Sequence, residues 1–201
     1  MNLELDNSKI IGVYASGNYG KSFLIRYLIE QINSYVPVFI YDTNQEKLSN
    51  YKGLKNTYFI TPQKLINLED PEVLEKSILK LRSEYSNFFL VIEDIDKFFT
   101  EQKKASIISK LSSDNRHQRI GVIYATKYPT QIPPRLRGNT HIFFFGQFVE
   151  PLYVKTINEI IPKDLIKKIK KPEFIMFNRS TNEKFRVVVD NGELKGELLN
   201  E

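Results

Sequence analysis

The chain has 201 residues and a mass of 23.5 kDa, a length typical of one domain or of one domain with a small appendage. Hydrophobic residues make up 41% and charged residues 26%, a balance that excludes collagen-like, mucin-like and wholly disordered chains. The net charge of +5 is uneven, because residues 1–100 carry 11 Lys/Arg against 13 Asp/Glu while residues 101–201 carry 18 against 11. A basic second half favours an anionic partner such as nucleic acid.

The sequence contains no cysteine, which excludes disulfides and thiolate metal sites, and its two histidines are too few for a convincing histidine metal site. No apolar run approaches the roughly 18 residues that a membrane-spanning helix needs. Residues 1–6 carry two acids and no apolar leader segment. We therefore expect no membrane span and an intracellular protein that is not secreted.

Short apolar strands alternate with amphipathic helices along the chain. The expected strands are Ile10–Tyr14, Val36–Tyr41, Thr57–Ile60, Phe88–Ile92, Ile120–Ala125 and Ile142–Phe145. The expected helices are Lys21–Ile32, Pro71 to about Tyr85, Lys103–Leu111, Leu152–Ile160 and Asp164–Ile169. The segments Phe174–Phe177 and Phe185–Val189 predict a C-terminal β-hairpin, and Pro133-Pro134 predicts a loop.

This alternation predicts an α/β fold in which a mostly parallel sheet carries helices on both faces. No linker rich in Pro, Gly or Ser divides the chain, so we expect a single domain over residues 1–201. Its core would span about residues 8–147, and the C-terminal helices and hairpin about residues 150–190.

The strongest motif lies between the first expected strand and the first expected helix, the context that a phosphate-binding loop requires. Gly17 and Gly20 let the backbone N–H groups curl around a phosphate chain. Lys21 supplies a cation to the β- and γ-phosphates, and Ser22 supplies a hydroxyl ligand for Mg²⁺. We therefore expect ATP and Mg²⁺ as cofactors. The expected nucleotide-binding residues are Ser16, Gly17, Asn18, Tyr19, Gly20, Lys21, Ser22 and Phe23, after Ala15 where glycine is commoner.

Two acids, Glu93 and Asp94, follow the apolar strand Phe88–Ile92. We expect Glu93 to hold Mg²⁺ through its water shell and Asp94 to orient or deprotonate the attacking water. The common order is Asp then Glu, so the two roles are open to exchange and Asp96 is an alternative. Paired carboxylates suit the activation of water, which favours hydrolysis over phosphoryl transfer to a substrate hydroxyl.

The strand Ile120–Ala125 ends in Thr126 and Lys127, which parallel pairing would bring to the same sheet edge as the loop. Lys127 is therefore expected to reach the γ-phosphate or the attacking water. Four arginines flank this strand, and one of them could contact the nucleotide of a neighbouring subunit. They are Arg116, Arg119, Arg135 and Arg137.

Over Ile10 to about Phe145, the sequence resembles the FtsK/HerA superfamily of DNA-pumping ATPases, and its small viral genome-packaging members in particular. The resemblance rests on the loop, the acids, Arg116-His117 before a strand, and Thr126 with Pro129 after it. It implies a RecA/ASCE-like P-loop fold and places Arg116 as the arginine that acts across subunits. The chain departs from the family pattern in its reversed acids and in Lys127, where the family has a glutamine.

The resemblance further implies a ring, commonly a hexamer, that threads double-stranded DNA, with a capsid or portal-vertex protein as a further partner. It implies a location in the host cytoplasm or on the virion. Lysines 163, 167, 168, 170 and 171 would then flank the DNA path through phosphate contacts. Three alternatives remain open: a protein- or virion-export ATPase of filamentous-phage type, a nucleotide or polynucleotide kinase, and a non-catalytic nucleotide-dependent binding protein.

Overall fold

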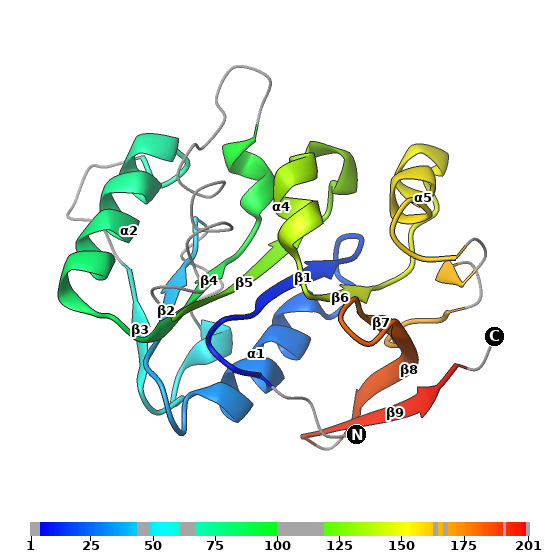
Figure 1. The fold of residues 1–201 in the computed structure, drawn as a ribbon, viewed down its shortest axis with the longest axis horizontal. Coiled ribbons are helices and arrows are strands. Elements are labelled where there is room, and N and C mark those ends of the chain that lie inside the picture. Colours follow the sequence, from blue (N-terminus) through cyan, green and yellow to red (C-terminus); the bar gives the residue numbers. More distant parts are fainter. Residues whose placement is uncertain are drawn as a thin grey trace.

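The computed structural model describes residues 5–43, 49–60, 67–99, 119–162, 165–166, 169–190 and 192–199. Within them the strands form one nine-stranded sheet in the order β3-β2-β4-β5-β1-β6-β7-β8-β9 (Figure 1). The strands are β1 Ile10–Tyr14, β2 Val38–Tyr41, β3 Thr57–Phe59, β4 Phe88–Ile92, β5 Ile120–Thr126, β6 Ile142–Phe145, β7 Phe174–Asn178, β8 Glu183–Asp190 and β9 Glu193–Leu198. The helices are α1 Lys21–Ile32, α2 Pro71–Glu84, η2 Ile95–Phe98, η3 Pro129–Gln131, α4 Pro134–Asn139 and α5 Pro151–Ile157.

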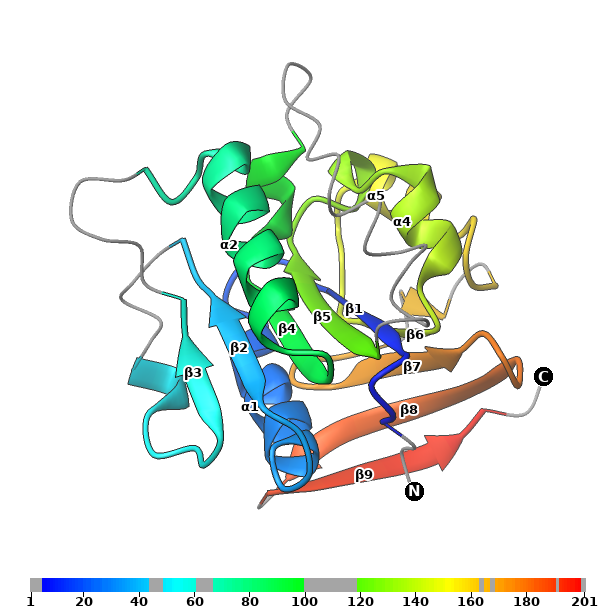
Figure 2. The ribbon, with the colours of Figure 1, turned by 60° about the vertical axis from the view of Figure 1, so that its left-hand side comes forward.

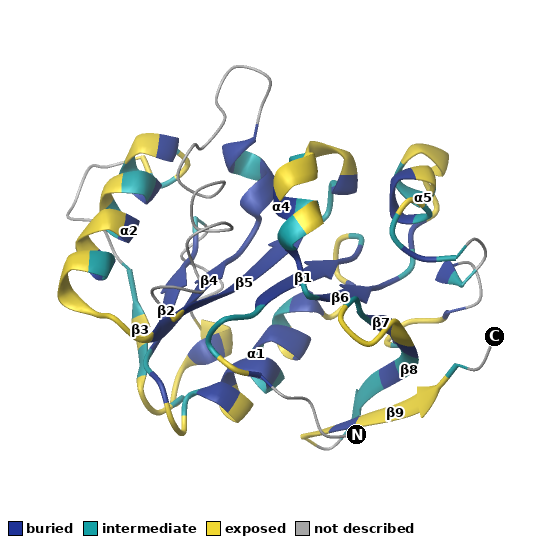
Figure 3. Cartoon of the chain, viewed as in Figure 1, coloured by how far each residue is buried: buried dark blue, intermediate teal, exposed yellow. Residues whose placement is uncertain are grey.

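The first six strands are parallel, as the alternation of strands and helices predicts. The loop-bearing strand β1 is central, with Tyr14 paired to Thr126 of β5 on one side and to Phe145 of β6 on the other. Strands β1, β4, β5 and β6 are buried along their whole length (Figure 3). Their nearly continuous apolar sequences follow from this burial, because both faces of the sheet are covered.

The two faces of the sheet are covered by different helices (Figures 1 and 2). On one face α1 buries Leu24, Leu28 and Ile32 against alternate residues of the parallel strands. On the other face α2, η2, α4 and α5 pack against the intervening residues. The predicted α/β architecture with helices on both faces is confirmed.

Helix α2 begins where the sequence predicts. The Asp70 side chain accepts a hydrogen bond of 3.0 Å from the backbone N–H of Glu72, and Pro71 occupies the first turn. An aspartate cap followed by proline is a strong helix-start signal, because proline lacks the N–H that would otherwise stay unsatisfied there.

The C-terminal strands β7, β8 and β9 run antiparallel and continue the sheet beyond β6 (Figure 2). The expected hairpin is therefore present as β7 and β8, and a third strand, β9, extends it. Strand β9 is mostly exposed and contains Gly196 and alternating charges, so no apolar pattern in the sequence marks it.

Two expectations for local structure are wrong. The Pro133-Pro134 segment opens a short helix, α4, because Pro134 can occupy the first turn. The expected helix Asp164–Ile169 is not seen in its described residues, since neither Leu165, Ile166 nor Ile169 is α-helical. The expected helix Lys103–Leu111 lies outside the described residues. No helix in the described part of the chain combines the length and the apolar character that crossing a bilayer requires.

Candidate nucleotide-binding site

The loop between β1 and α1 has the conformation that its glycine and asparagine allow. Gly20, immediately before the helix, has φ = 91°, and Asn18 has φ = 56°. These left-handed conformations favour Gly and are tolerated by Asn. The backbone N–H of Ala15 donates to the carbonyl oxygen of Thr126 at 3.2 Å, so the start of the loop is tied to the end of β5.

The Lys21 side chain folds over its own loop. Its Nζ atom donates to the carbonyl oxygens of Ala15 at 2.9 Å and Ser16 at 2.8 Å. The side chain is 9% exposed, so the ammonium group is held inside the loop rather than in solvent. Together with the positive end of α1, this buried cation makes the loop attractive to phosphate.

Tyr19 anchors the loop to the C-terminal strands. Its ring meets that of Phe174 on β7 edge-on, with centroids 5.4 Å apart. The Tyr19 ring also packs closely against Gly146. A Cβ atom added at Gly146 would lie 2.6 Å from both the Tyr19 ring and the Ala15 side chain. Tyr19 is only 4% exposed, so most of its side chain is engaged in this packing, and the small remaining surface borders the pocket described below.

Glu93 is fully buried and points toward the start of α1. Its Oε2 atom lies 3.5 Å from the Ser22 hydroxyl, and its Oε1 atom accepts a hydrogen bond from the Tyr51 hydroxyl. Burial, followed by the adjacent Glu93 carboxylate, raises the pKa of Tyr51 far above its ordinary value, so the hydroxyl stays protonated and donates. Tyr51 was missed in the sequence, because nothing in its polar surroundings relates it to a strand 40 residues away.

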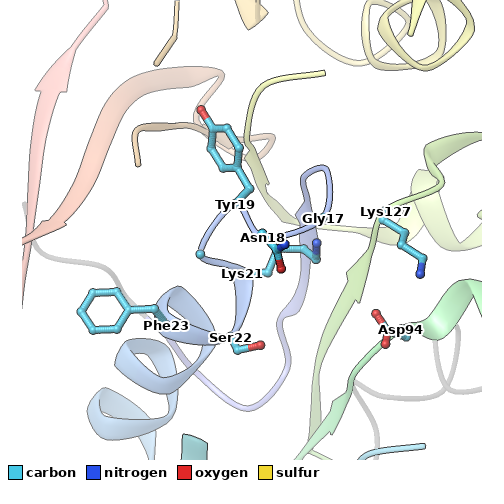
Figure 4. Close-up of a pocket in the computed structure, with 9 residues that line it drawn as sticks. Gly17, Asn18, Tyr19, Lys21, Ser22, Phe23, Asp94 and Lys127 are labelled. Atoms are coloured by element: carbon cyan, nitrogen blue, oxygen red, sulfur yellow. The ribbon is translucent and has the colours of Figure 1, made fainter. Parts of the chain in front are cut away.

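Asp94 turns the other way. Its backbone has φ = 49°, so the chain leaves the strand direction and the carboxylate faces the loop. Asp94 and Lys127 line one side of a pocket of about 330 Å³, and loop residues line the other (Figure 4). Those residues are Gly17, Asn18, Tyr19, Gly20, Lys21, Ser22 and Phe23. The structure therefore brings together seven of the eight predicted loop residues, Asp94 and Lys127, and the lining of this pocket does not include Ser16. The two acids lie in different environments, because Asp94 lines the pocket and Glu93 is buried beside Ser22.

Asp96 is not a pocket residue. It is 2% exposed and accepts hydrogen bonds from the Thr126 hydroxyl at 2.7 Å and from the Lys127 backbone N–H at 3.3 Å. Burial raises the pKa of Asp96, and these hydrogen bonds partly offset the effect. Asp96 thus supports the strand end that carries Lys127, and the catalytic alternative that the sequence offers for Asp96 stays a prediction.

The arginines lie away from this pocket wherever they are described. Arg119 is exposed and precedes the amino end of β5, and Arg135 is exposed on α4. Arg137 lies 3.9 Å from the Glu159 carboxylate. Arg116 lies outside the described residues.

The donor set suits a Mg²⁺ ion that arrives with a nucleotide. Ser22 and Glu93 offer hydroxyl and carboxylate oxygens, and Mg²⁺ is usually held by one or two such groups together with phosphates and waters. No cluster of three or more His, Cys, Asp or Glu able to hold a metal occurs among the described residues, so they offer no all-protein metal cage.

No protein-family model and no curated protein matches the sequence. Solved structures do match. The genome packaging NTPase B204 from Sulfolobus turreted icosahedral virus 2, in complex with ATP-gammaS, aligns with a TM-score of 0.74 at 18% identity, covering 96% of this chain and 98% of that chain. Its complex with AMPPCP gives a TM-score of 0.75 at 17% identity, over 98% and 100%.

The cytoplasmic domain of the Thermomonospora curvata Type VII Secretion ATPase EccC aligns with a TM-score of 0.66 at 11% identity, covering 87% of this chain but 24% of that chain. At these identities the likeness concerns the fold. The chain has the α/β fold of a viral genome-packaging NTPase and of secretion ATPases, in agreement with the resemblance to the FtsK/HerA superfamily found in the sequence.

Proposed function

We propose that this chain is a Mg²⁺-dependent ATPase and that it drives double-stranded DNA into a preformed viral capsid. One observation carries the proposal. The loop residues Lys21 and Ser22 face Glu93 and Asp94 at one sheet edge, in a fold shared over nearly the full length of both chains with a viral packaging NTPase. The nucleotide complexes of that neighbour support ATP as the ligand.

The division between the two acids supports hydrolysis. Glu93, beside Ser22, would hold Mg²⁺, which when bound neutralises charge that develops on the phosphates. Asp94 faces the pocket and would accept a proton from the attacking water. Lys127, which lines the same side of the pocket, would stabilise the negative charge on the γ-phosphate. In a nucleotide or polynucleotide kinase the phosphoryl acceptor is a substrate hydroxyl, so release of inorganic phosphate without an acceptor would distinguish hydrolysis from that alternative.

The DNA partner is supported by charge. Residues 101–201 contain 18 Lys/Arg against 11 Asp/Glu, and Lys170 and Lys171 are exposed. Such lysines can contact DNA phosphates without reading sequence. The remaining lysines of that group, at 163, 167 and 168, lie outside the described residues.

We further propose that identical subunits assemble into a ring, a hexamer by resemblance, and that this ring binds a capsid or portal-vertex protein. We place the protein in the host cytoplasm or on the virion. Arg119 lies at the far end of β5 from its own pocket, a strand of seven residues or roughly 23 Å away. Arg119 therefore cannot reach the pocket of its own subunit, and Arg116, the first choice by resemblance, would act on the nucleotide of a neighbouring subunit.

A second function is favoured by a specific observation. EccC is a secretion ATPase with the same fold, so export of a protein or virion is the main alternative to DNA packaging. The two functions differ in what stimulates ATP hydrolysis, because a DNA motor is stimulated by double-stranded DNA and an export motor by its protein cargo.

The experiment is to measure phosphate release from ATP and Mg²⁺ with and without double-stranded DNA, at low and physiological salt. We expect activity that DNA stimulates and that salt suppresses, with none left in Lys21→Ala. Lys195→Ala is the matched control, because Lys195 is exposed on β9 and pairs with Asp190 at 2.6 Å. Activity indifferent to DNA would support the export function, and absence of activity in the wild type would reject the ATPase proposal.

A further inference from the structure

Tyr51 connects the predicted metal-binding acid to a segment that lies outside the nucleotide-binding motifs. Its side chain is 1% exposed, and its hydroxyl donates to Oε1 of Glu93. The other carboxylate oxygen, Oε2, faces the Ser22 hydroxyl at 3.5 Å. The Tyr51 hydroxyl thus occupies one carboxylate oxygen of Glu93 and leaves the other directed at Ser22.

The Tyr51 turn is itself held by the helix that carries Ser22. Arg26, one turn further along α1, donates to the carbonyl oxygen of Asn50 at 2.6 Å and lies 3.5 Å from that of Lys52. Its Nε atom is 3.0 Å from Glu30 on the same helix, which restrains the guanidinium. The residues on both sides of Tyr51 are therefore anchored to α1.

These contacts close a circuit of four residues. Ser22 and Arg26 lie on α1, Arg26 holds the turn that presents Tyr51, and Tyr51 holds Glu93 opposite Ser22. A glutamate side chain has one more rotatable bond than an aspartate, so a buried Glu at this position needs a support that fixes its terminal oxygens. The tyrosine provides that support.

We propose that Tyr51 is a positioning residue for Mg²⁺: it fixes the orientation of Glu93 and so sets the affinity of the nucleotide site for the metal. This inference rests on the proposed function, since it assumes that Ser22 and Glu93 receive Mg²⁺ with a nucleotide. It assigns to the Asn50–Lys52 turn, through Arg26, a part in the nucleotide site that its sequence does not indicate.

The test compares Tyr51→Phe with the wild type in binding ATPγS, first in EDTA and then at increasing Mg²⁺. The variant keeps the buried ring and removes only the hydroxyl. We expect unchanged affinity in EDTA, together with a Mg²⁺ requirement raised about tenfold to a hundredfold, the usual effect of losing a group that orients a metal ligand. At saturating Mg²⁺ the variant should reach the same ATPγS affinity as the wild type, which a general structural defect would not allow.

Tyr41→Phe is the matched control. Tyr41 is also fully buried, and its hydroxyl donates to the carbonyl oxygen of Leu68 at 3.0 Å rather than to Glu93. It should lose a comparable hydrogen bond and leave the Mg²⁺ requirement unchanged. Arg26→Gln is a second variant that keeps the Tyr51 hydroxyl and releases its turn. It should raise the Mg²⁺ requirement by a smaller factor, and it carries the test if Tyr51→Phe does not fold.

The outcomes separate the two proposals. Equal Mg²⁺ requirements in Tyr51→Phe and Tyr41→Phe would overturn the positioning role and leave the ATPase proposal intact. Loss of ATPγS affinity in EDTA as well as in Mg²⁺ would assign Tyr51 to the loop rather than to the metal, which also overturns the inference. A wild-type chain that binds no ATPγS under either condition would overturn both proposals.

Discussion

The hydroxyl of Thr126 donates a hydrogen bond of 2.7 Å to Oδ1 of Asp96, and the backbone N–H of Lys127 lies 3.3 Å from the same oxygen. The Thr126 oxygen in turn accepts from the backbone N–H of Tyr128 at 2.9 Å. One buried carboxylate thus joins the turn after β4 to the end of β5, and Asp94 and Lys127 line the pocket from these two neighbouring positions.

Replacing Asp96 by asparagine should make the protein more stable at neutral pH and slower in ATP hydrolysis. Asp96→Asn keeps an oxygen at the accepting position and removes a buried charge. Because burial raises the pKa of Asp96, the native state holds this proton more tightly than the unfolded chain does, and the wild type loses stability as pH rises above the ordinary pKa of 3.8. The melting temperature of Asp96→Asn relative to wild type should therefore increase as the pH rises above 3.8.

The same substitution should slow hydrolysis. The amide binds the Lys127 N–H less firmly than a carboxylate does, so we expect the rate constant to fall about tenfold with little change in ATPγS affinity. Asp96→Ala is the contrast, because it leaves the Thr126 hydroxyl and the Lys127 N–H without this acceptor and should cost about 1–3 kcal/mol of unfolding free energy. A fall in melting temperature for Asp96→Asn at neutral pH would contradict the assignment.

Substitutions of the two neighbouring acids should have different kinetic effects. Asp94→Asn, on the pocket side, should reduce the rate of hydrolysis about 10²- to 10⁴-fold while ATPγS and Mg²⁺ still bind. Glu93→Gln, beside Ser22, should mainly raise the Mg²⁺ concentration needed for activity. Steady-state hydrolysis at varied Mg²⁺ distinguishes them, and the opposite pattern would mean that the reversed order of the acids has also exchanged their roles.

Lys127 should be replaceable by glutamine and not by alanine. Its side chain borders the pocket opposite the loop, and its Nζ atom lies 5.2 Å from the centre of the Tyr128 ring. Glutamine retains a polar group at that place and should keep measurable hydrolysis, whereas Lys127→Ala should lose at least tenfold in the rate constant at unchanged ATPγS affinity. Rates equal to that of the wild type in both variants would argue that Lys127 does not contact the γ-phosphate or water.

A methyl group at Gly146 should distort the nucleotide-binding loop, because Gly146 contacts the loop residues Ala15 and Tyr19. In Gly146→Ala the new Cβ would lie 2.6 Å from the Tyr19 ring and from the Ala15 side chain, so both contacts must open. We expect ATPγS affinity to fall about tenfold or more. Gly138→Ala is the control, because a Cβ there meets nothing within 4 Å and α4 should gain about 0.5–1 kcal/mol from the change. Calorimetric titration of both variants decides whether the Gly146 contact controls the loop.

The sequence predicted the elements whose pattern is local. Strands β1, β4 and β6 and helix α1 match their expected bounds. A strand that is buried along its whole length has a continuous apolar sequence, and the phosphate-binding loop motif indicates where α1 begins. The pocket residues of the loop, Asp94 and Lys127 were likewise found, since parallel strands bring their carboxyl ends to one edge.

What the sequence could not predict depends on contacts between distant segments. Tyr51 approaches Glu93 across 42 positions, and Tyr19 packs on Phe174 across 155. Strand β9 forms because β8 offers it an edge, although of its six residues only Leu194 is buried. The burial of Asp96 under the end of β5, where it accepts from the Thr126 hydroxyl, is likewise a tertiary contact that the sequence does not indicate.

Because Tyr19 of the loop packs on Phe174 of β7, the nucleotide-binding loop depends on the C-terminal strands. These strands therefore cannot be removed by truncation without affecting the rest of the sheet. Strand β6 contains three consecutive phenylalanines, and β7 pairs along it through Phe143 and Phe177. A fragment cut after β6 would expose this edge, and an apolar edge of that kind recruits other chains into insoluble aggregates. The Tyr19–Phe174 contact also links these strands to the loop. Random mutations that destabilise the C-terminal strands should therefore be recovered in genetic screens as nucleotide-binding defects, although they lie more than 150 residues from the loop in the sequence.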